Sequence, residues 1–369
     1  MKILIMGFAK IKYMPYVNFY LDQLLNDAAP EHEIHLLYWN RDLKQEDTDR
    51  LGRCILHEFR CYQEDDVSRS SKISNFLKYR KFAKKVLKRE RFDFIFVLHS
   101  MPGVLLADTL TSKYRQKYVF DYRDSTYEHF LPYKKVIGAL VKHSRATFVS
   151  SDGFRRFLPE KQKAKIHTSH NLLTDSLSHR DQRAQNGCPS DKIRIAFWGF
   201  IRHEQINRVL IERIAKDDRF ELHYYGREQQ VAFRLKAFAA EIHAENVRFH
   251  GEYKPEDRYE FVKNTDLIHN VYLDSNTLLA MGNKYYDGAI FRIPQICMPG
   301  SFMGDRATKA GIGCAIDPRD PDFTEQVYRY YTSLDPACFK KSCDDELERI
   351  LSEYREGILL IKDVLKETR

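Results

Sequence analysis

The chain has 369 residues, of which 43% are hydrophobic and 13% aromatic, and its formal net charge is +8. This length allows two domains with separate cores, and the apolar content excludes an intrinsically disordered chain. The longest apolar runs, such as 3–6 and 94–98, have the length of strands and fall short of the roughly 18 residues that cross a bilayer. Lys10 and Lys12 follow the first run closely, so it predicts a β-strand rather than a secretory signal.

The 7 cysteines are scattered, with no CxxC pair and no Cys/His spacing typical of zinc. An odd, dispersed set of this kind is typical of reduced thiols in a reducing compartment. We therefore expect a cytoplasmic protein with no metal site and no bound cofactor.

The first half of the chain alternates strand-like and helix-like segments, the pattern of an α/β protein with largely parallel sheets. Crossover helices are expected at 18–26 and in the basic segment 69–91. Together these elements predict an N-terminal Rossmann-like domain over residues 1–175. Its strands are expected at 3–7, 34–39, 55–61, 94–98, 118–122 and 146–150.

The basic segment 69–91, RSSKISNFLKYRKFAKKVLKRER, holds the strongest cluster of positive charge. An amphipathic basic helix can lie on an anionic membrane surface, or it can be an outer helix packed on a sheet, and both interpretations stay open. Nucleic-acid binding is not expected, because no recognition helix or zinc finger accompanies the charge. The predicted apolar face comprises Ile73, Phe76, Leu77, Phe82, Val86 and Leu87.

Polar side chains mark the ends of two predicted strands in this domain. His99 follows the strand 94–98, while Asp121, Arg123 and Asp124 lie at the end of the strand 118–122. Ligands in such sheets bind beyond the carboxyl ends of the strands. We expect Asp121 to pair with Arg123 or to cap the backbone, and Asp124 and His99 to contact a ligand. A purely structural hydrogen-bonding role for His99 is the alternative.

A polar stretch, 174–192, predicts a linker, after which the alternation restarts. The two halves begin alike, with KILIMGFAK at 2–10 and RIAFWGFIR at 194–202, so that Gly7 and Gly199 end matching strands. A second Rossmann-like domain is predicted over 190–343, with the main cleft between the domains. Its strands are expected at 193–199, 220–226, 247–251, 267–271, 295–298 and 314–316.

Residues 282–316 predict a helix, a short strand, a glycine-bearing loop, a second helix and a last strand. Asn283 is a good cap for the first helix, and Asp287 lies one turn further along. Phosphates favour the N–H groups and positive dipole of a helix N-terminus, while a carboxylate accepts hydrogens from ribose hydroxyls. The segment therefore suits a ligand with a diol and phosphates, the alternative being an ordinary αβ unit. The charged segment 344–369 predicts a long amphipathic helix.

The segment 282–316 resembles the nucleotide-sugar segment of GT-B glycosyltransferases, most closely those of family 4. That family writes it as N-K-x-x-E, with a proline seven residues later and a G-x-G beyond. Asn283, Lys284, Asp287 and Pro294 fall on the first places, and residues 311–313 fall on the last. The resemblance implies that Asp287 contacts the donor ribose.

The resemblance also implies that cations clasp the donor pyrophosphate at the turn after strand 193–199. Arg202 stands at the family's arginine, whereas Asn207 occupies the place of its lysine, so Arg227 or Lys284 is expected to compensate. Many members carry a second glutamate eight residues before the first, and Leu279 stands there in this chain.

Further donor contacts are expected from Gly7 and Gly199, and from Tyr225 or Tyr253 stacking on the base. His99 is expected to touch the donor sugar, and Asp124 the sugar or acceptor hydroxyls. We thus predict a catalytic set of His99, Asp124 and Arg202.

The resemblance implies the GT-B fold, with an interdomain cleft and a C-terminal helix that crosses back onto the first domain. It further implies a retaining, metal-independent transferase that moves a sugar from a nucleotide diphosphate donor, expected to be a UDP-sugar. The expected acceptor is lipid-linked or a saccharide, in bacterial capsule, lipopolysaccharide O-antigen or exopolysaccharide synthesis at the inner face of the membrane. Two rivals stay open, a GT-B UDP-sugar epimerase and a catalytically silent GT-B binding module, the latter suggested by Leu279 and Asn207.

Overall fold

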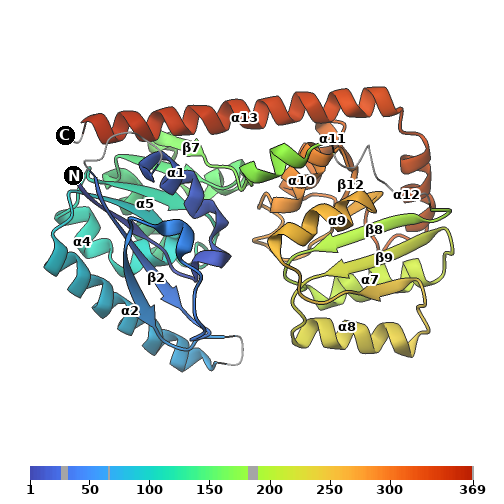
Figure 1. Cartoon of the computed structure of the whole chain (residues 1–369), viewed down its shortest axis with the longest axis horizontal. Coiled ribbons are helices and arrows are strands. Elements are labelled where there is room, and N and C mark those ends of the chain that lie inside the picture. Colours follow the sequence, from blue (N-terminus) through green and yellow to red (C-terminus); the bar gives the residue numbers. More distant parts are fainter. Residues whose placement is uncertain (26–31, 65–66, 182–189, 368–369) are drawn as a thin grey trace. The chain divides into compact units, whose positions relative to one another are not determined.

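A computed structural model describes residues 1–25, 32–64, 67–181 and 190–367. The chain forms two compact units (Figure 1). Unit 1 comprises Met1–Asn171 and Ser352–Arg369, and unit 2 comprises Leu172–Leu351. Part of the predicted linker, 182–189, lies outside the described residues, and so does the end of the helix predicted at 18–26.

Unit 1 is built on a seven-stranded sheet in the order β3-β2-β1-β4-β5-β6-β7, in which every neighbouring pair is parallel. Strands β4 and β5 are fully buried along their length, as expected for a parallel sheet covered on both faces. The last strand, β7, is an addition that the sequence pattern did not predict. The strands are β1 Lys2–Met6, β2 Glu33–Asn40, β3 Ile55–Arg60, β4 Phe94–Leu98, β5 Tyr118–Tyr122, β6 Ala146–Val149 and β7 Ile166–Thr168.

Helices cover both faces of this sheet. On one face α2, α3, α4 and α5 pack on one another, with Gly103 of α3 against Phe120. On the other face α1 brings Phe19 against Phe148. The helices of the unit are α1 Asn18–Leu25, α2 Arg69–Glu90, α3 Ser100–Leu105, α4 Ala107–Ser112 and α5 Leu131–His143, with 3-10 turns η1 Ile11–Tyr13, η2 Pro15–Val17, η3 Asp49–Leu51, η4 Asp152–Phe157 and η5 Glu160–Lys165.

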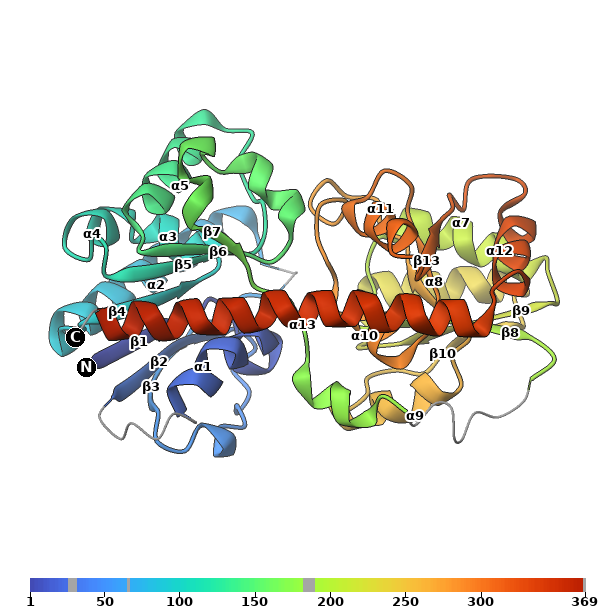
Figure 2. The same cartoon turned by 90° about the horizontal axis from the view of Figure 1, so that it is seen from above.

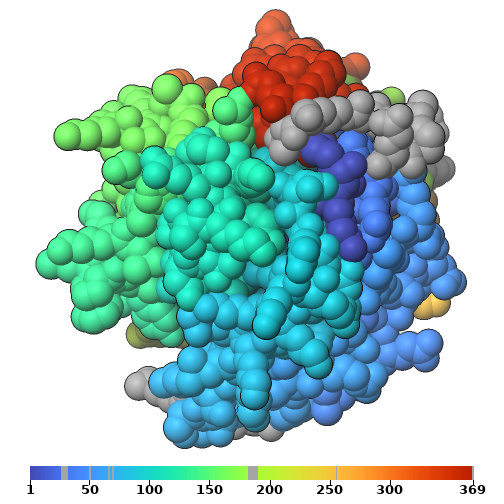
Figure 3. All heavy atoms as spheres, turned by 90° about the vertical axis from the view of Figure 1, so that its left-hand side faces the viewer, coloured from blue at the N-terminus to red at the C-terminus, as the bar shows by residue number. Residues whose placement is uncertain are grey.

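The basic segment forms α2, but its buried face differs from the predicted one. Ile73 and Leu77, which were expected to face the sheet, are 61% and 59% exposed. Asn75 and Tyr79 point inward instead, and the Tyr79 hydroxyl donates to the backbone oxygen of Gly7 at 2.7 Å. Figure 3 views unit 1 from the side on which α2 lies.

Unit 2 holds a six-stranded sheet in the order β10-β9-β8-β11-β12-β13, again with only parallel neighbours. Both sheets thus share the doubly wound order, in which the strand sequence reverses direction beside the first strand of each unit. The strands are β8 Ile193–Trp198, β9 Phe220–Tyr225, β10 Val247–Phe249, β11 Leu267–Asn270, β12 Gln295–Cys297 and β13 Gly313–Ala315.

The main core of unit 2 lies between its sheet and α7, which buries Ile206, Leu210 and Ile214. On the other face Trp198 contacts α9 through Phe261. The helices are α7 Glu204–Ala215, α8 Gln230–Glu241, α9 Arg258–Lys263, α10 Asn283–Phe291, α11 Phe302–Lys309, α12 Phe323–Thr332 and α13 Pro336–Glu367, with 3-10 turns η6 Thr174–His179 and η7 Pro255–Asp257.

The C-terminal helix α13 begins at Pro336, earlier than the predicted 344, with proline in the first turn where its missing N–H costs nothing (Figure 2). Its first part belongs to unit 2, where Glu346 accepts hydrogen bonds from Tyr285 and Arg306. Its last part belongs to unit 1, where Tyr354 packs on Phe19. No described helix is both long enough and apolar enough to span a membrane.

Candidate functional site

In unit 2, two residues near the start of helix α10, Lys284 and Asp287, are hydrogen-bonded to Trp198 at the end of strand β8. The indole Nε1 of Trp198 donates to Asp287 Oδ2 at 2.8 Å. The ammonium group of Lys284 donates to the Trp198 backbone oxygen at 3.2 Å and to the Tyr272 hydroxyl at 2.5 Å. Because β8 and β11 are the strands beside which the order reverses, this junction lies where doubly wound sheets bind ligands.

Asp287 is only 2% exposed. Burial raises the pKa of its carboxyl group, opposed by the charge of Arg258 and by the hydrogen bond from Trp198. The sequence motif gave no indication that Trp198 binds Asp287. The signal was the indole N–H itself, which needs a hydrogen-bond acceptor when it is buried. Asn283 begins α10 as expected, but the cap position belongs to Gly282 and no side chain caps the helix.

Lys284 is buried with its ammonium 4.0 Å from the centroid of the Phe197 ring. Burial and the neighbouring charge of Arg202 lower its pKa to about 7. Arg202 itself is exposed in the turn after β8. Arg202 and Lys284, two of the predicted phosphate-binding cations, therefore repel each other at this junction.

Asn207, which takes the place of the family's lysine, holds the β8–α7 turn together. Its Nδ2 donates to the backbone oxygens of Arg202 at 2.8 Å and His203 at 3.1 Å. Its Oδ1 accepts hydrogen bonds from Tyr224 at 2.8 Å and His269 at 2.9 Å. Asn207 thus fixes the backbone that presents Arg202, and its oxygen also accepts hydrogen bonds from Tyr224 and His269, which a lysine cannot do.

The ends of β8 and β9 approach very closely. A Cβ atom on Gly226 would lie 1.9 Å from the backbone oxygen of Gly199, and Gly199 has a φ of 126°. Arg227 follows at once and is half-buried. Tyr225 stacks on His250 and on Phe261, with ring centroids 4.2 Å away in each case. Stacking on a base would therefore require one of these neighbours to move.

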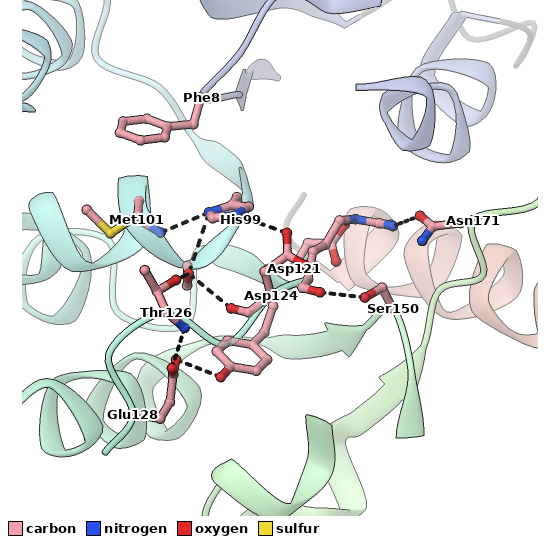
Figure 4. Close-up of polar contacts among 12 residues, drawn as sticks. Phe8, His99, Met101, Asp121, Asp124, Thr126, Glu128, Ser150 and Asn171 are labelled. Carbon is pink, nitrogen blue, oxygen red and sulfur yellow. Dashed lines mark hydrogen bonds and ion pairs between the residues drawn. The ribbon is translucent and has the colours of Figure 1, made fainter. Parts of the chain in front are cut away.

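In unit 1, His99 and Asp124 lie together at the carboxyl edge of the sheet (Figure 4). His99 Nε2 lies 3.2 Å from Asp124 Oδ2, and its Nδ1 accepts the backbone N–H of Met101 at 3.3 Å. The same imidazole stacks on the ring of Phe8, with centroids 6.4 Å apart. Its φ of 86° is a conformation that non-glycine residues rarely adopt, and such backbone strain is typical of functional sites.

The other acidic residue of this edge has a structural role, as predicted. Arg123 Nε donates to Asp121 Oδ2 at 2.9 Å, and the Tyr20 hydroxyl donates to the same oxygen at 2.8 Å. Arg123 also reaches Asn171 and Ser169. Gly7 follows β1, and a Cβ at this position would lie 2.5 Å from Met14 Cε, the flexible end of a side chain that could move aside.

Among the described residues, one histidine and carboxylate group has the spacing of a metal site: Glu33, His35 and Glu90. The ammonium of Lys2 lies between its carboxylates, 3.0 Å from Glu33 and 2.7 Å from Glu90. This cluster, at the amino end of β1 and β2, is therefore already paired with cations, Lys2 at both carboxylates and Arg89 at Glu90.

The folded chain is similar to several solved structures over nearly its whole length. It matches sucrose-phosphate synthase from Thermosynechococcus elongatus with a TM-score of 0.72 and 13% identity, covering 100% of this chain and 98% of that one. It matches Anabaena HepE in complex with UDP and glucose at 0.63 and 12%, covering 100% and 99%. A glycosyltransferase from Rickettsia africae gives 0.67 and 14%, covering 99% of each chain.

The chain has the GT-B fold. No family model and no curated protein sequence matches it. GT-B neighbours also include a putative UDP-N-acetylglucosamine 2-epimerase from Listeria monocytogenes, with a TM-score of 0.55 and 10% identity, covering 96% of this chain and 98% of that one. At such identities the likeness describes the fold, and the activity has to be argued from the residues.

Proposed function

We propose that the protein is a glycosyltransferase, similar to family 4, that transfers a sugar from a nucleotide diphosphate sugar to a saccharide or lipid-linked acceptor. The donor is a UDP-sugar, and the setting is bacterial surface polysaccharide synthesis at the inner face of the membrane. One observation carries the proposal: Lys284 and Asp287 of the N-K-x-x-D motif are both hydrogen-bonded to Trp198, at the strand end where a GT-B sheet reverses order.

The donor is assigned to unit 2. The positive charge of Arg202 is among the causes of the depressed Lys284 pKa, so these two cations repel each other. A diphosphate placed between them would relieve this repulsion and gain charge-assisted hydrogen bonds. Support for UDP comes from the fold neighbours, since HepE has been solved with UDP and with UDP-glucose.

In the proposed reaction, the bond between the sugar anomeric carbon and the diphosphate oxygen breaks, and the acceptor hydroxyl oxygen bonds to that carbon. UDP leaves with the electron pair, and the proton of the acceptor hydroxyl passes to the departing diphosphate. Arg202 and Lys284 stabilise the negative charge that develops on the leaving diphosphate, in the place of a metal ion. Retention of the anomeric configuration follows from the resemblance to family 4.

The acceptor side is assigned to unit 1, through Asp124 and through His99, which was expected at the donor sugar but lies 3.2 Å from Asp124. Because His99 Nδ1 accepts a backbone N–H, its Nε2 carries the proton in the neutral ring and donates toward Asp124. Asp124 is 46% exposed in its side chain, so its carboxylate is accessible to sugar hydroxyls.

Membrane contact is assigned to the outer face of α2. Ile73 and Leu77 are exposed there beside exposed basic residues of the same helix, Lys78, Lys81, Lys85 and Lys88. An apolar pair flanked by lysines suits an anionic lipid surface, where each nearby lysine contributes about 1 kcal/mol.

Donor binding is tested by thermal unfolding with UDP-, GDP-, ADP- and dTDP-sugars. A ligand at 100 times its dissociation constant should add roughly 2.7 kcal/mol to the free energy of unfolding. We expect a response to the UDP-sugars, weakened by Arg202→Ala and by Asp287→Asn. Asparagine keeps an acceptor for Trp198 while removing the charge, and Arg248→Ala, at an arginine 58% exposed on β10, is the control.

Measurements of turnover distinguish the transferase from the epimerase and from the silent binding module. Release of UDP with formation of a glycosylated product supports the transferase. Interconversion of the donor without an acceptor identifies the epimerase, and tight donor binding with neither activity identifies the silent module. An absence of response to every nucleotide would overturn donor binding itself.

A further inference from the structure

Arg41 lies beside the His99 site of unit 1, immediately after β2. Its guanidinium carbon is 5.0 Å from the centroid of the Phe8 ring and 4.7 Å from that of Trp39. Nη2 donates to the backbone oxygen of Phe8. Because the imidazole of His99 is one of the neighbours of the Phe8 ring, one aromatic side chain separates Arg41 from the proposed acceptor residues.

The positive charge of Arg41 has no carboxylate partner among the described residues, and its Nε is buried without a hydrogen-bond acceptor. The other cations of this edge are paired. Arg123 binds Asp121, and Lys10, which is 1% exposed, binds Asp42 at 2.7 Å. An unsatisfied buried donor costs about 1–3 kcal/mol, so its retention calls for a functional reason.

The surroundings of Arg41 favour an anion. Burial lowers the pKa of its guanidinium, and Tyr16, Tyr79 and Glu64 oppose this shift. The nearby Tyr16 hydroxyl lies within the electrostatic reach of Arg41, Arg123 and Asp124 together. An anion held by Arg41 would therefore be close to the residues assigned to the acceptor.

We propose that Arg41 binds an anionic group of the acceptor, so that the acceptor is an acidic sugar or a sugar phosphate rather than a neutral one. The inference rests on the proposed function in assigning acceptor binding to unit 1. The guanidinium carries N–H donors of the kind that bind a carboxylate or a phosphate, and Nε is left without an acceptor while Nη2 already donates to Phe8. The rings of Phe8 and Trp39 pack against the guanidinium and restrict its motion, which limits the conformational entropy lost on binding.

The test is calorimetric titration of the full chain, with and without UDP, using glucose 6-phosphate, glucuronate and glucose as probes. We expect the charged probes to bind the wild type more tightly than glucose. Arg41→Gln should weaken them at least tenfold, a loss of about 1.4 kcal/mol. Arg115→Gln is the matched control, because Arg115 is exposed just before β5, at the opposite edge of the sheet. Preference for one charged probe tells phosphate from carboxylate.

Arg41→Lys controls for a folding defect. Lysine keeps the positive charge, and its aliphatic side chain can still pack against the aromatic rings. This variant should fold as the wild type does and bind the charged probes with intermediate affinity. Charged probes that bind Arg41→Gln and Arg41→Lys as tightly as the wild type, or that bind the wild type no better than glucose does, overturn the proposal. UDP titrated into the same samples reports on unit 2, so failure of the donor site is seen separately from failure at Arg41.

Discussion

Trp198 Nε1 and Asp287 Oδ2 are joined by a 2.8 Å hydrogen bond between residues 89 positions apart in the chain. The bond links the end of β8 to the second turn of α10, and both groups are buried. It therefore holds the motif in a fixed place relative to the turn that carries Arg202. Lys284, bonded to the backbone of the same tryptophan, completes the junction.

The depressed pKa of Lys284 predicts that donor binding takes up a proton. At pH 8 most of the Lys284 side chains are neutral, since burial and Arg202 lower the pKa to about 7. A bound diphosphate favours the charged form, so UDP affinity should fall by up to tenfold per pH unit above 7. Calorimetry in buffers of different ionisation enthalpy measures the uptake, which Lys284→Met should abolish.

The same group predicts the pH dependence of stability. Below pH 7 the lysine is charged in both states, and its burial penalty is fully present. Between pH 7 and the unfolded value of 10.5 the unfolded chain binds more protons, so stability rises with pH in this window. Denaturant unfolding at pH 7 and pH 9.5 should show this rise in the wild type relative to Lys284→Met. An equal pH dependence in both proteins would contradict the assignment.

Placing the family's lysine at position 207 should destabilise the protein and weaken donor binding. Asn207→Lys removes acceptors and donors that satisfy Arg202, Tyr224 and His269, and it places a charge at a site only 3% exposed. We expect a loss of about 3 kcal/mol or more in the free energy of unfolding, with weaker donor binding. Urea unfolding measures the loss, and Gln205→Lys, at an exposed position of the same helix, is the control.

The exposed apolar pair of α2 predicts membrane binding. Ile73→Ser combined with Leu77→Ser should reduce sedimentation with vesicles that contain anionic phosphatidylglycerol, because about 1.5–3 kcal/mol of burial per side chain is lost. Leu359→Ser is the matched control, since Leu359 is 61% exposed on α13. Vesicles of neutral lipid should bind the wild type weakly, and equal binding of both variants would argue against α2.

Two glycines are expected to respond in opposite directions to alanine. In Gly226→Ala the new Cβ would meet the Gly199 backbone oxygen at 1.9 Å, so the strand ends must separate and stability should fall by several kcal/mol. In Gly138→Ala, within α5, the nearest atom is Pro159 Cγ at 3.5 Å. The helix should then gain about 0.5–1 kcal/mol. Thermal unfolding of the two variants compares them directly.

The sequence alone determined the alternation of elements and, through the resemblance, the GT-B fold. Strand positions followed from short apolar runs bounded by polar turns, as in β4 and β5, because a parallel sheet covered on both faces requires continuous burial. The motif at Asn283 and Asp287 could be found as a pattern because its spacing is local. The pairing of Asp121 with Arg123 was predicted for the same reason, since a single residue separates them.

Tertiary structure decided what depends on residues far apart in the chain. The apolar side chains of α2 face the sheet or solvent according to which neighbour lies opposite, so Ile73 and Leu77 could not be assigned from periodicity. The role of Asn207 required Tyr224 and His269 to arrive from two other strands. Arg41 could be recognised as a cation without a carboxylate partner in the described part of the chain only once the fold had paired the cations around it, because the compensation of charge is a property of three-dimensional neighbours.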